Sequence, residues 1–449
     1  MWYTGRRTQE RGSAMSTFKQ WAKLPPMGWN SWDCFGAAVT EQELLANADY
    51  MAAHLKPYGW EYVVCDIQWY EPKAEGHIYK KFTELEMDGY GRLLPAQNRF
   101  PSAADGKGFR PIADYIHKLG LKFGVHLMRG VPRQAVAANC PILGSDKTCR
   151  DIAHPFSVCP WNTDMYGVLD CPDAQLYYDS VIAQFASWGV DFVKCDDICV
   201  TEFRKWDNPY TADYEIEMLR RAIDRCGREI VLSLSPGPAP RDKAPHLAAN
   251  ANMWRMTGDF WDEWGALHRM FAKCVEWQGV AKEGTYPDCD MLPVAMLIDS
   301  DPSRPPIRRW TRFTEAEQVT MLTLWGIFKS PLMIGGDMTQ FDDFTLRLLT
   351  NEDYMRMFRT VHGAREFSRD EKNGKGTILW IAEGDGCKYA AVFNTDDKPR
   401  RIRVPLDRML MPDTPYTLYD VWKGEPLGIR KNAVSLSVES HGAALLQIV

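Results

Sequence analysis

The sequence predicts a (β/α)₈ barrel followed by a smaller antiparallel β domain. Between about residues 25 and 349, short β-rich runs alternate with amphipathic helical patterns, which is typical of βα units around a parallel sheet. After about residue 350, short segments with period-2 alternation are separated by turns rich in Gly, Asp and Pro. We therefore expect a poorly ordered N-terminal leader over 1–24, a barrel over 25–365 and an antiparallel β-sandwich over 366–449.

Eight segments are candidates for the barrel strands, and this number suits a closed barrel better than an open sheet. In chain order they are the stretch before Trp29, EYVVCD, KFGVHLM, DFVKCD, IVLSLS, NMWRMTGD, TYPDCD and SPLMIGG.

Two of the intervening helices carry their own start signals. Thr40 with Glu43, and Thr314 with Glu317, have the spacing of a capping box, in which each side chain bonds the other residue's backbone N–H. We expect a helix to begin after each threonine.

The C-terminal region contains the alternating segments GTILWIA, KYAAVFN, RIRVPL, YTLYDVW and AVSLSV. Turn-rich pieces such as EGDG and NTDDKP separate them, which is typical of an antiparallel sheet or sandwich. Because this region has no cluster of chemically active side chains, we expect it to pack against the barrel.

Composition and charge exclude several classes of function. The chain has 449 residues, with 59 acidic and 53 basic side chains and a net charge of −6, and no block of like charge suits a phosphate backbone or an anionic membrane. No apolar run approaches the roughly 18 to 20 residues that cross a bilayer. The first two dozen residues lack the apolar core of a signal peptide. We therefore expect a cytoplasmic protein that binds neither nucleic acid nor a membrane.

Polar side chains follow the apolar cores of most candidate strands. In a (β/α)₈ barrel the carboxyl ends of the strands meet at one face, where the chemistry takes place. The residues expected there are Asp66, His126, Arg129, Lys194, Asp196, Asp197, Asp259, Asp288 and Asp290.

Tryptophans accompany these polar groups. The chain has 17, and Trp29, Trp32, Trp69, Trp254 and Trp261 lie beside the proposed strand ends. Sugars stack their C–H faces on aromatic rings and offer hydroxyls to carboxylates, Lys and Arg. The sequence therefore predicts a carbohydrate site.

Six ordered motifs resemble glycoside hydrolase family 27, the melibiase-type α-galactosidases. They are PPMGWNSW, the RFPS segment with ADYIHKLGLKFG, VKCDD, WRMTGD, DCDML and LWGIFKSPLMIGGD. The resemblance covers about residues 25 to 351, and the β-rich C-terminal region is also of the family's kind. It implies a retaining glycosidase that uses two aspartates, with α-galactosides as the main expected substrates.

The family's motifs assign roles to individual positions. Asp196 matches the nucleophile, and Asp259 matches the general acid/base. The resemblance further implies sugar contacts from Trp32, Asp66, Lys194, Arg255, Asp290 and Met291. On a strand, Lys194 would share a face with Asp196 and favour its ionised form, whereas Asp197 would face the opposite side.

Three departures affect the part of the pocket that reads the sugar. Ile67 stands where α-galactosidases have a second aspartate, His126 where they have a tyrosine, and Ser235 with Pro236 where they have Cys-Glu. His126 and Ser235 are therefore expected in sugar binding, with altered contacts. The family also contains β-L-arabinopyranosidases and isomaltodextranases, which are the alternative activities.

Two hypotheses of other classes remain. One is a carbohydrate-binding protein without turnover, which the presence of both Asp196 and Asp259 argues against. The other is a metal hydrolase using Asp288, Asp290 and His126, but the chain has no HxH or HExxH motif. We expect no metal and no cofactor, and the sequence leaves the oligomeric state open.

Overall fold

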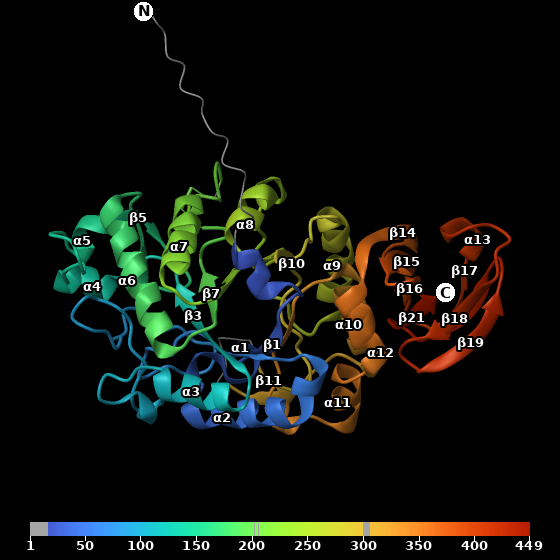
Figure 1. Cartoon of the computed structure of the whole chain (residues 1–449), viewed down its shortest axis with the longest axis horizontal. Coiled ribbons are helices and arrows are strands. Elements are labelled where there is room, and N and C mark those ends of the chain that lie inside the picture. The colour runs from blue at the N-terminus through green and yellow to red at the C-terminus, as the bar shows by residue number, and fades with distance from the viewer. Residues whose placement is uncertain (1–16, 202, 205, 300–305) are drawn as a thin grey trace, which may run out of the picture.

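A computed structural model describes residues 17–201, 203–204, 206–299 and 306–449, and its centre is a sheet of eight parallel strands (Figure 1). Their order across the sheet is β10-β9-β8-β7-β3-β2-β1-β13. The strands are β1 (Met27–Asn30), β2 (Tyr62–Cys65), β3 (Lys122–Met128), β7 (Phe192–Asp196), β8 (Val231–Leu234), β9 (Met253–Arg255), β10 (Tyr286–Asp288) and β13 (Leu332–Ile334). Seven lie within predicted segments, and β1 begins in the stretch before Trp29 and continues to Asn30, so the predicted barrel strands are confirmed.

The two edge strands of this sheet meet through a short seam. Just after β10, the backbone N–H of Leu292 donates to Met333 O at 2.7 Å, and Gly335 N donates to Leu292 O at 2.9 Å. These two bonds join the β10 segment to β13. The sheet therefore curls round on itself as a barrel.

Helices connect the strands. In the barrel they are α1 (Trp32–Phe35), α2 (Glu41–Tyr50), α3 (Arg110–Lys118), α4 (Arg133–Ala138), α5 (Cys149–Ile152), α6 (Pro172–Trp188), α7 (Asp213–Arg225), α8 (Ala244–Asn250), α9 (Trp264–Trp277), α10 (Glu315–Phe328), α11 (Asp343–Leu349) and α12 (Glu352–Thr360). Short single-turn pieces are η2 (Gly36–Ala38), η3 (Met51–Leu55), η4 (Lys56–Tyr58), η5 (Pro101–Ala103), η6 (Arg241–Lys243) and η7 (Met338–Gln340). Both predicted capping boxes are confirmed, at the starts of α2 and α10.

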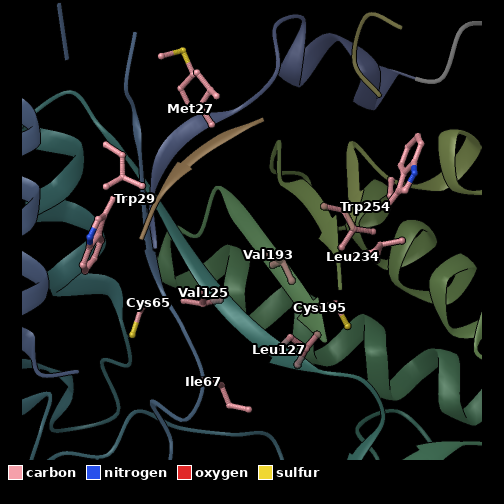
Figure 2. Close-up of a cluster of buried hydrophobic side chains, with 14 of the residues drawn as sticks. Met27, Trp29, Cys65, Ile67, Val125, Leu127, Val193, Cys195, Leu234 and Trp254 are labelled. Atoms are coloured by element: carbon pink, nitrogen blue, oxygen red, sulfur yellow. The ribbon is translucent and has the colours of Figure 1, made fainter. Parts of the chain in front are cut away.

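Strand alternation separates two layers of side chains. In β7, Val193 and Cys195 join the cluster between the strands and the helices, and Figure 2 shows them in that layer. Phe192 belongs to the cluster inside the barrel. Because successive side chains on a strand alternate in direction, Lys194 and Asp196 lie on the same inner side as Phe192.

Two insertions extend the face at the carboxyl ends of the strands. After β3, the short strands β4 (Val131–Pro132), β5 (Ala153–Val158) and β6 (Met165–Val168) form a small sheet in the order β4-β6-β5. After β10, β11 (Met296–Ile298) pairs with β12 (Arg308–Trp310). The sequence analysis did not predict either insertion.

The predicted leader differs in part from the structure. Residues 1–16 lie outside the described residues, but Thr17–Ala22 form the short 3₁₀ helix η1. Phe18 is buried beneath the guanidinium of Arg220, 4.6 Å from its ring centre, and its carbonyl accepts a bond from Asn252 Nδ2 at 3.1 Å. Ala22 joins the cluster inside the barrel. This segment is ordered because it covers apolar side chains at the amino ends of the strands.

The C-terminal region is an antiparallel β-sandwich, as predicted. One sheet has the order β14-β15-β16-β21-β18-β19, and β17 pairs with β20 in a second. The elements are β14 (His362–Lys372), β15 (Lys375–Gly384), β16 (Cys387–Asn394), β17 (Arg400–Val404), α13 (Leu406–Met409), β18 (Tyr416–Asp420), β19 (Glu425–Arg430), β20 (Val434–Val438) and β21 (Ala443–Ile448). β14 begins at His362, within the segment that the sequence analysis assigned to the barrel.

Both faces of the six-stranded sheet are buried at its central strands β15 and β16. Ile378 and Trp380 of β15 belong to the same apolar cluster as the barrel, whereas Leu379 and Ile381 belong to the interior of the sandwich. Figure 1 shows α10 and α12 on the side of the barrel that faces this sheet. Across the described part of the chain, no helix is long and apolar enough to cross a membrane.

Candidate active site

A pocket of about 270 Å³ opens at the carboxyl ends of the strands. β2, β7 and β9 supply its charged side chains, either from the strand itself or from the loop that follows. The lining residues are Trp32, Asp66, Ile67, Tyr79, Trp161, Lys194, Asp196, Pro236, Arg255, Asp259 and Met291.

Asp196 is the last residue of β7 and its side chain is only 10% exposed. His126 Nε2 lies 2.8 Å from Asp196 Oδ2, Lys194 Nζ lies 3.7 Å from the same oxygen, and the hydroxyl of Ser235 donates to Oδ1. Burial alone would raise the pKa of Asp196, but Lys194 and His126 hold it below the usual value of an aspartate. Asp196 is therefore ionised at neutral pH.

Lys194 connects two strand ends. Its ammonium donates to Asp66 Oδ2 at 2.9 Å, and Asn30 Nδ2 donates to that oxygen at 2.6 Å. Burial would lower the pKa of Lys194, but Asp196 and Asp66 raise it above the ordinary value. The lysine therefore stays charged and fixes both carboxylates.

Arg255 ends β9 and organises the opposite wall. Its Nη2 lies 2.5 Å from Asp290 Oδ2 and 3.4 Å from Asp259 Oδ1. Asp290 is buried and also accepts a bond from Phe260 N at 2.7 Å, and burial raises its pKa to about 7 although Arg255 opposes the shift. Asp259, by contrast, is 61% exposed. Of the three carboxyl groups that line the pocket, Asp66 and Asp196 are therefore enclosed and Asp259 is accessible.

Aromatic side chains form a third wall. Trp32 and Tyr79 stack with ring centres 5.7 Å apart and planes 8° from parallel, and Trp161 lies 5.5 Å beyond Tyr79. The backbone carbonyl of Trp32 is held by His77 Nε2 at 3.1 Å. Such rings offer a flat apolar surface to the C–H face of a sugar.

Asp197 points away from the pocket. Its Oδ2 lies 3.0 Å from Arg129 Nη2, and Arg129 Nη1 donates to Glu215 Oε1 at 2.9 Å. Tyr178 donates its hydroxyl to Glu215 Oε2 at 2.6 Å. This buried group of side chains lies behind the end of β7, where the backbone N–H of Arg129 also donates to Asp196 O at 3.2 Å.

Known proteins are similar to this chain in both sequence and fold. Residues 162–359 match the family described as alpha galactosidase A, and residues 374–448 match the alpha galactosidase C-terminal beta sandwich domain. The crystal structure of a GH27 β-L-arabinopyranosidase from Geobacillus stearothermophilus is 51% identical, covers 97% of this chain and 98% of its own, and superposes with a TM-score of 0.92. The chain belongs to glycoside hydrolase family 27. It is therefore a glycosidase that acts on carbohydrates. This confirms the glycosidase that the sequence motifs predicted.

Three further proteins extend the comparison. A variant of the Geobacillus enzyme has been solved in complex with arabinose. Alpha-galactosidase A from Cellvibrio japonicus is 26% identical to this chain, over 96% of the chain and 93% of its own length. Alpha-galactosidase I from Mortierella vinacea, at 22% identity, shares the fold with a TM-score of 0.71.

Seven of the ten site residues expected from the family 27 resemblance line the pocket. They are Trp32, Asp66, Lys194, Asp196, Arg255, Asp259 and Met291. His126, Ser235 and Asp290 lie one layer behind, where the first two hold Asp196 and the third holds Arg255.

Sequence reasoning missed two lining residues. Tyr79 comes from the long connection after β2 and Trp161 from the short loop between β5 and β6, and no strand pattern or family motif marked them. The only available signal was that each is an aromatic residue in a loop at the carboxyl ends of the strands.

A metal ion could in principle use Asp66, His126 and Asp196, whose ligand atoms lie within 4.8 Å of one another. The ammonium of Lys194 lies between the two carboxylates, 2.9 Å from Asp66 and 3.7 Å from Asp196. This ammonium supplies the positive charge that a metal would bring and would repel a cation. The donor set therefore does not fit a metal centre.

Proposed function

We propose that the protein is a retaining glycosidase in which Asp196 is the nucleophile and Asp259 is the general acid/base. The observation that carries this proposal is one small pocket in which Asp196 and Asp259 have opposite environments, the first enclosed and the second accessible. Lys194 and His126 keep Asp196 ionised, as a nucleophile requires. Asp259 is accessible at the pocket wall, where a leaving group would depart.

The proposed reaction has two steps. Asp196 attacks C1 of the sugar while the bond from C1 to the leaving oxygen breaks, and Asp259 gives its proton to that oxygen. Water then attacks C1 of the glycosyl ester, Asp259 takes a proton from the water, and Asp196 is released. Two inversions leave the configuration at C1 unchanged.

The pocket volume of about 270 Å³ suits a single pyranose ring. Ile67 is buried in the wall beside Asp66 and Trp32. An apolar side chain there offers no hydrogen bond to a hydroxymethyl group on the sugar. β-L-Arabinopyranose has the ring hydroxyl configuration of α-D-galactopyranose and lacks that group, so we propose β-L-arabinopyranosides as the preferred substrates. The Geobacillus relative supports this choice.

α-Galactosides are the second candidate, because relatives such as the Cellvibrio enzyme are α-galactosidases. The two candidate substrates differ in the hydroxymethyl group, which only the galactoside carries. Residue 67 therefore affects them differently, according to whether its side chain can form a hydrogen bond with that group. Wild-type protein should have a higher kcat/KM on p-nitrophenyl β-L-arabinopyranoside than on p-nitrophenyl α-D-galactopyranoside. Ile67→Asp should shift that ratio towards the galactoside by roughly tenfold or more, because a charged hydrogen bond contributes about 1.5 to 3 kcal/mol.

Ile67→Leu is the matched control, since it keeps an apolar side chain of equal volume and should leave the ratio nearly unchanged. A wild type that prefers the galactoside by orders of magnitude, with a ratio insensitive to Ile67→Asp, would contradict the sugar assignment. The retaining mechanism would stand independently of that result.

The mechanism has its own test. Asp196→Ala should abolish turnover while the unfolding temperature stays close to that of wild type, and azide should restore activity by attacking C1 directly. The product should then be the glycosyl azide with inverted configuration, identified by NMR. A rescued product of retained configuration would show that another group is the nucleophile.

A further inference from the structure

A second hollow lies directly beyond Asp259. Its volume is about 530 Å³, twice that of the sugar pocket, and it runs along one face of α9. We call it the α9 hollow, and its lining residues are Pro238, Thr257, Gly258, Asp259, Phe260, Ala266, Arg269, Met270, Ala272, Lys273 and Glu276.

A ridge of backbone separates the α9 hollow from the sugar pocket. A Cβ added to Gly237 would lie 2.2 Å from Thr257 O, so the loops after β8 and β9 pack backbone against backbone there. Pro236 and Arg255 line the sugar pocket on one side of this contact, and Pro238 and Thr257 line the α9 hollow on the other.

Asp259 belongs to the walls of both cavities, and it is the only residue that they share among those that the structure describes. Its carboxyl group is 61% exposed, so it can reach an oxygen atom on the ridge. Under the proposed function, that oxygen is the one through which the sugar is joined to its leaving group. The leaving group therefore has its nearest free space in the α9 hollow.

The lining indicates what kind of leaving group fits. Phe260 and Met270 form a buried apolar floor, and Pro238, Ala266 and Ala272 form apolar sides. Charged side chains occur along α9 at Arg269, Lys273 and Glu276. A second sugar would need many hydrogen-bond partners, whereas an apolar ring system needs only such a surface.

We propose that the α9 hollow is the binding site for the leaving group and that it favours a bulky apolar ring system over a second sugar. This inference rests on the proposed function for the sugar pocket and the role of Asp259. It adds to that function a preference for one chemical class of leaving group.

The test compares two leaving groups of closely similar acidity on the same sugar. Biphenyl-4-yl β-L-arabinopyranoside carries one more ring than phenyl β-L-arabinopyranoside, and that ring extends from the ridge into the hollow. Burying roughly 50 Å² of apolar surface corresponds to about tenfold in binding, so wild type should favour the biphenyl glycoside by roughly tenfold in kcat/KM.

Ala266→Phe and Ala272→Phe would each fill part of the hollow. Both should reduce the ratio of kcat/KM for the biphenyl glycoside to kcat/KM for the phenyl glycoside towards one, and this ratio is the measured quantity because it cancels any general effect of the substitution on the rate. Ala272 is exposed on α9, so its variant keeps the test available if the more buried Ala266→Phe fails to fold. Ala53→Phe is the matched control, because Ala53 is exposed on η3, in the connection between β1 and β2.

The proposal would be overturned if the biphenyl-to-phenyl ratio of kcat/KM in wild type were near one. It would also be overturned if both α9 variants left that ratio unchanged. A higher kcat/KM for a disaccharide leaving group than for the biphenyl group would also overturn it. If the protein cleaves only α-galactosides, the sugar assignment fails separately. The same pair of leaving groups on α-galactose then decides whether the hollow binds them.

Discussion

Lys194 controls the charge of the nucleophile that we assign. Its ammonium lies 3.7 Å from Asp196 and, with His126, holds the pKa of that carboxyl below the ordinary value. Removing the positive charge in Lys194→Met should raise the pKa of Asp196, because a neighbouring cation favours the ionised form by about 1 to 3 pH units. The acid limb of the kcat/KM profile should therefore move to higher pH by about one unit or more.

Lys194→Arg is the control for the positive charge, because it changes the shape of the side chain but keeps its charge. It keeps a cation beside Asp66 and Asp196, so its acid limb should stay near that of wild type even if the maximal rate falls. The position of the limb is the measured quantity, since both substitutions disturb sugar binding. If the acid limb of the kcat/KM profile lay at the same pH in wild type and Lys194→Met, Lys194 would not govern the ionisation of Asp196.

At the scale of single residues, strand alternation predicted which side chains face the pocket, but it did not predict which side chains lie behind them. The period of two correctly put Lys194 and Asp196 together and turned Asp197 away. It could not tell that His126 and Ser235 hold Asp196 from behind, because that depends on how neighbouring strands are staggered. Tyr79 stands in a loop, where no periodic pattern fixes the direction of a side chain.

Arg129 joins three elements behind the active site. It follows β3, pairs with Asp197 after β7 and bonds Glu215 on α7, and it is 1% exposed. Arg129→Met would leave the carboxyl groups of Asp197 and Glu215 buried without their counter-ion, which costs about 3 to 5 kcal/mol. We expect a loss of that size in the free energy of unfolding, measured by urea titration at pH 8.

The pH dependence of this loss has a definite sign. Burial raises the pKa of Asp197 to about 7, although Arg129 opposes the shift, so the folded protein binds more protons than the unfolded chain between about pH 4 and 7. Stability from this group therefore falls as the pH rises through that window. Without Arg129 the pKa rises further, and the variant should regain part of its stability at pH 5.5. A loss that is independent of pH would contradict this account.

Among the elements, local signals were the reliable ones. The capping boxes at Thr40 and Thr314 involve residues three apart, and both formed as predicted. The β11–β12 pair was missed because its paired residues, such as Met296 and Trp310, are not close in sequence. Neither strand has the length or alternation that marks a strand in sequence, since each spans three residues.

At the scale of the whole molecule, the barrel and the β-sandwich share one core. Phe393 of β16 packs edge-on against Phe271 of α9, with ring centres 4.8 Å apart. Trp422 donates its indole N–H to Thr323 of α10 at 2.8 Å and stacks on Tyr354 of α12. Because Phe271, Phe393 and Tyr354 are fully buried at these contacts, we expect both parts to unfold in a single transition.

Phe393→Ala tests this coupling. Removing a buried phenylalanine costs about 3 to 5 kcal/mol. Loss of activity, which reports the barrel, and loss of the far-UV circular dichroism signal, which reports both parts together, should shift together to lower temperature. Val392→Ala, on the opposite face of the same strand, is the comparison, because Val392 belongs to the sandwich interior. Two separated transitions in either variant would show that the parts unfold independently.

The order in which the barrel strands occur in the chain has a consequence for folding kinetics. β1 pairs with β13, so Met27 lies beside Leu332, and the seam also needs Leu292 and Gly335. During synthesis the barrel cannot close until the segment that contains β13 has left the ribosome. Until then β1 and the growing end of the sheet present unpaired backbone edges. Contacts between such distant parts of a chain form slowly. The nascent protein therefore depends on its early βα units remaining soluble while they wait for the last strand.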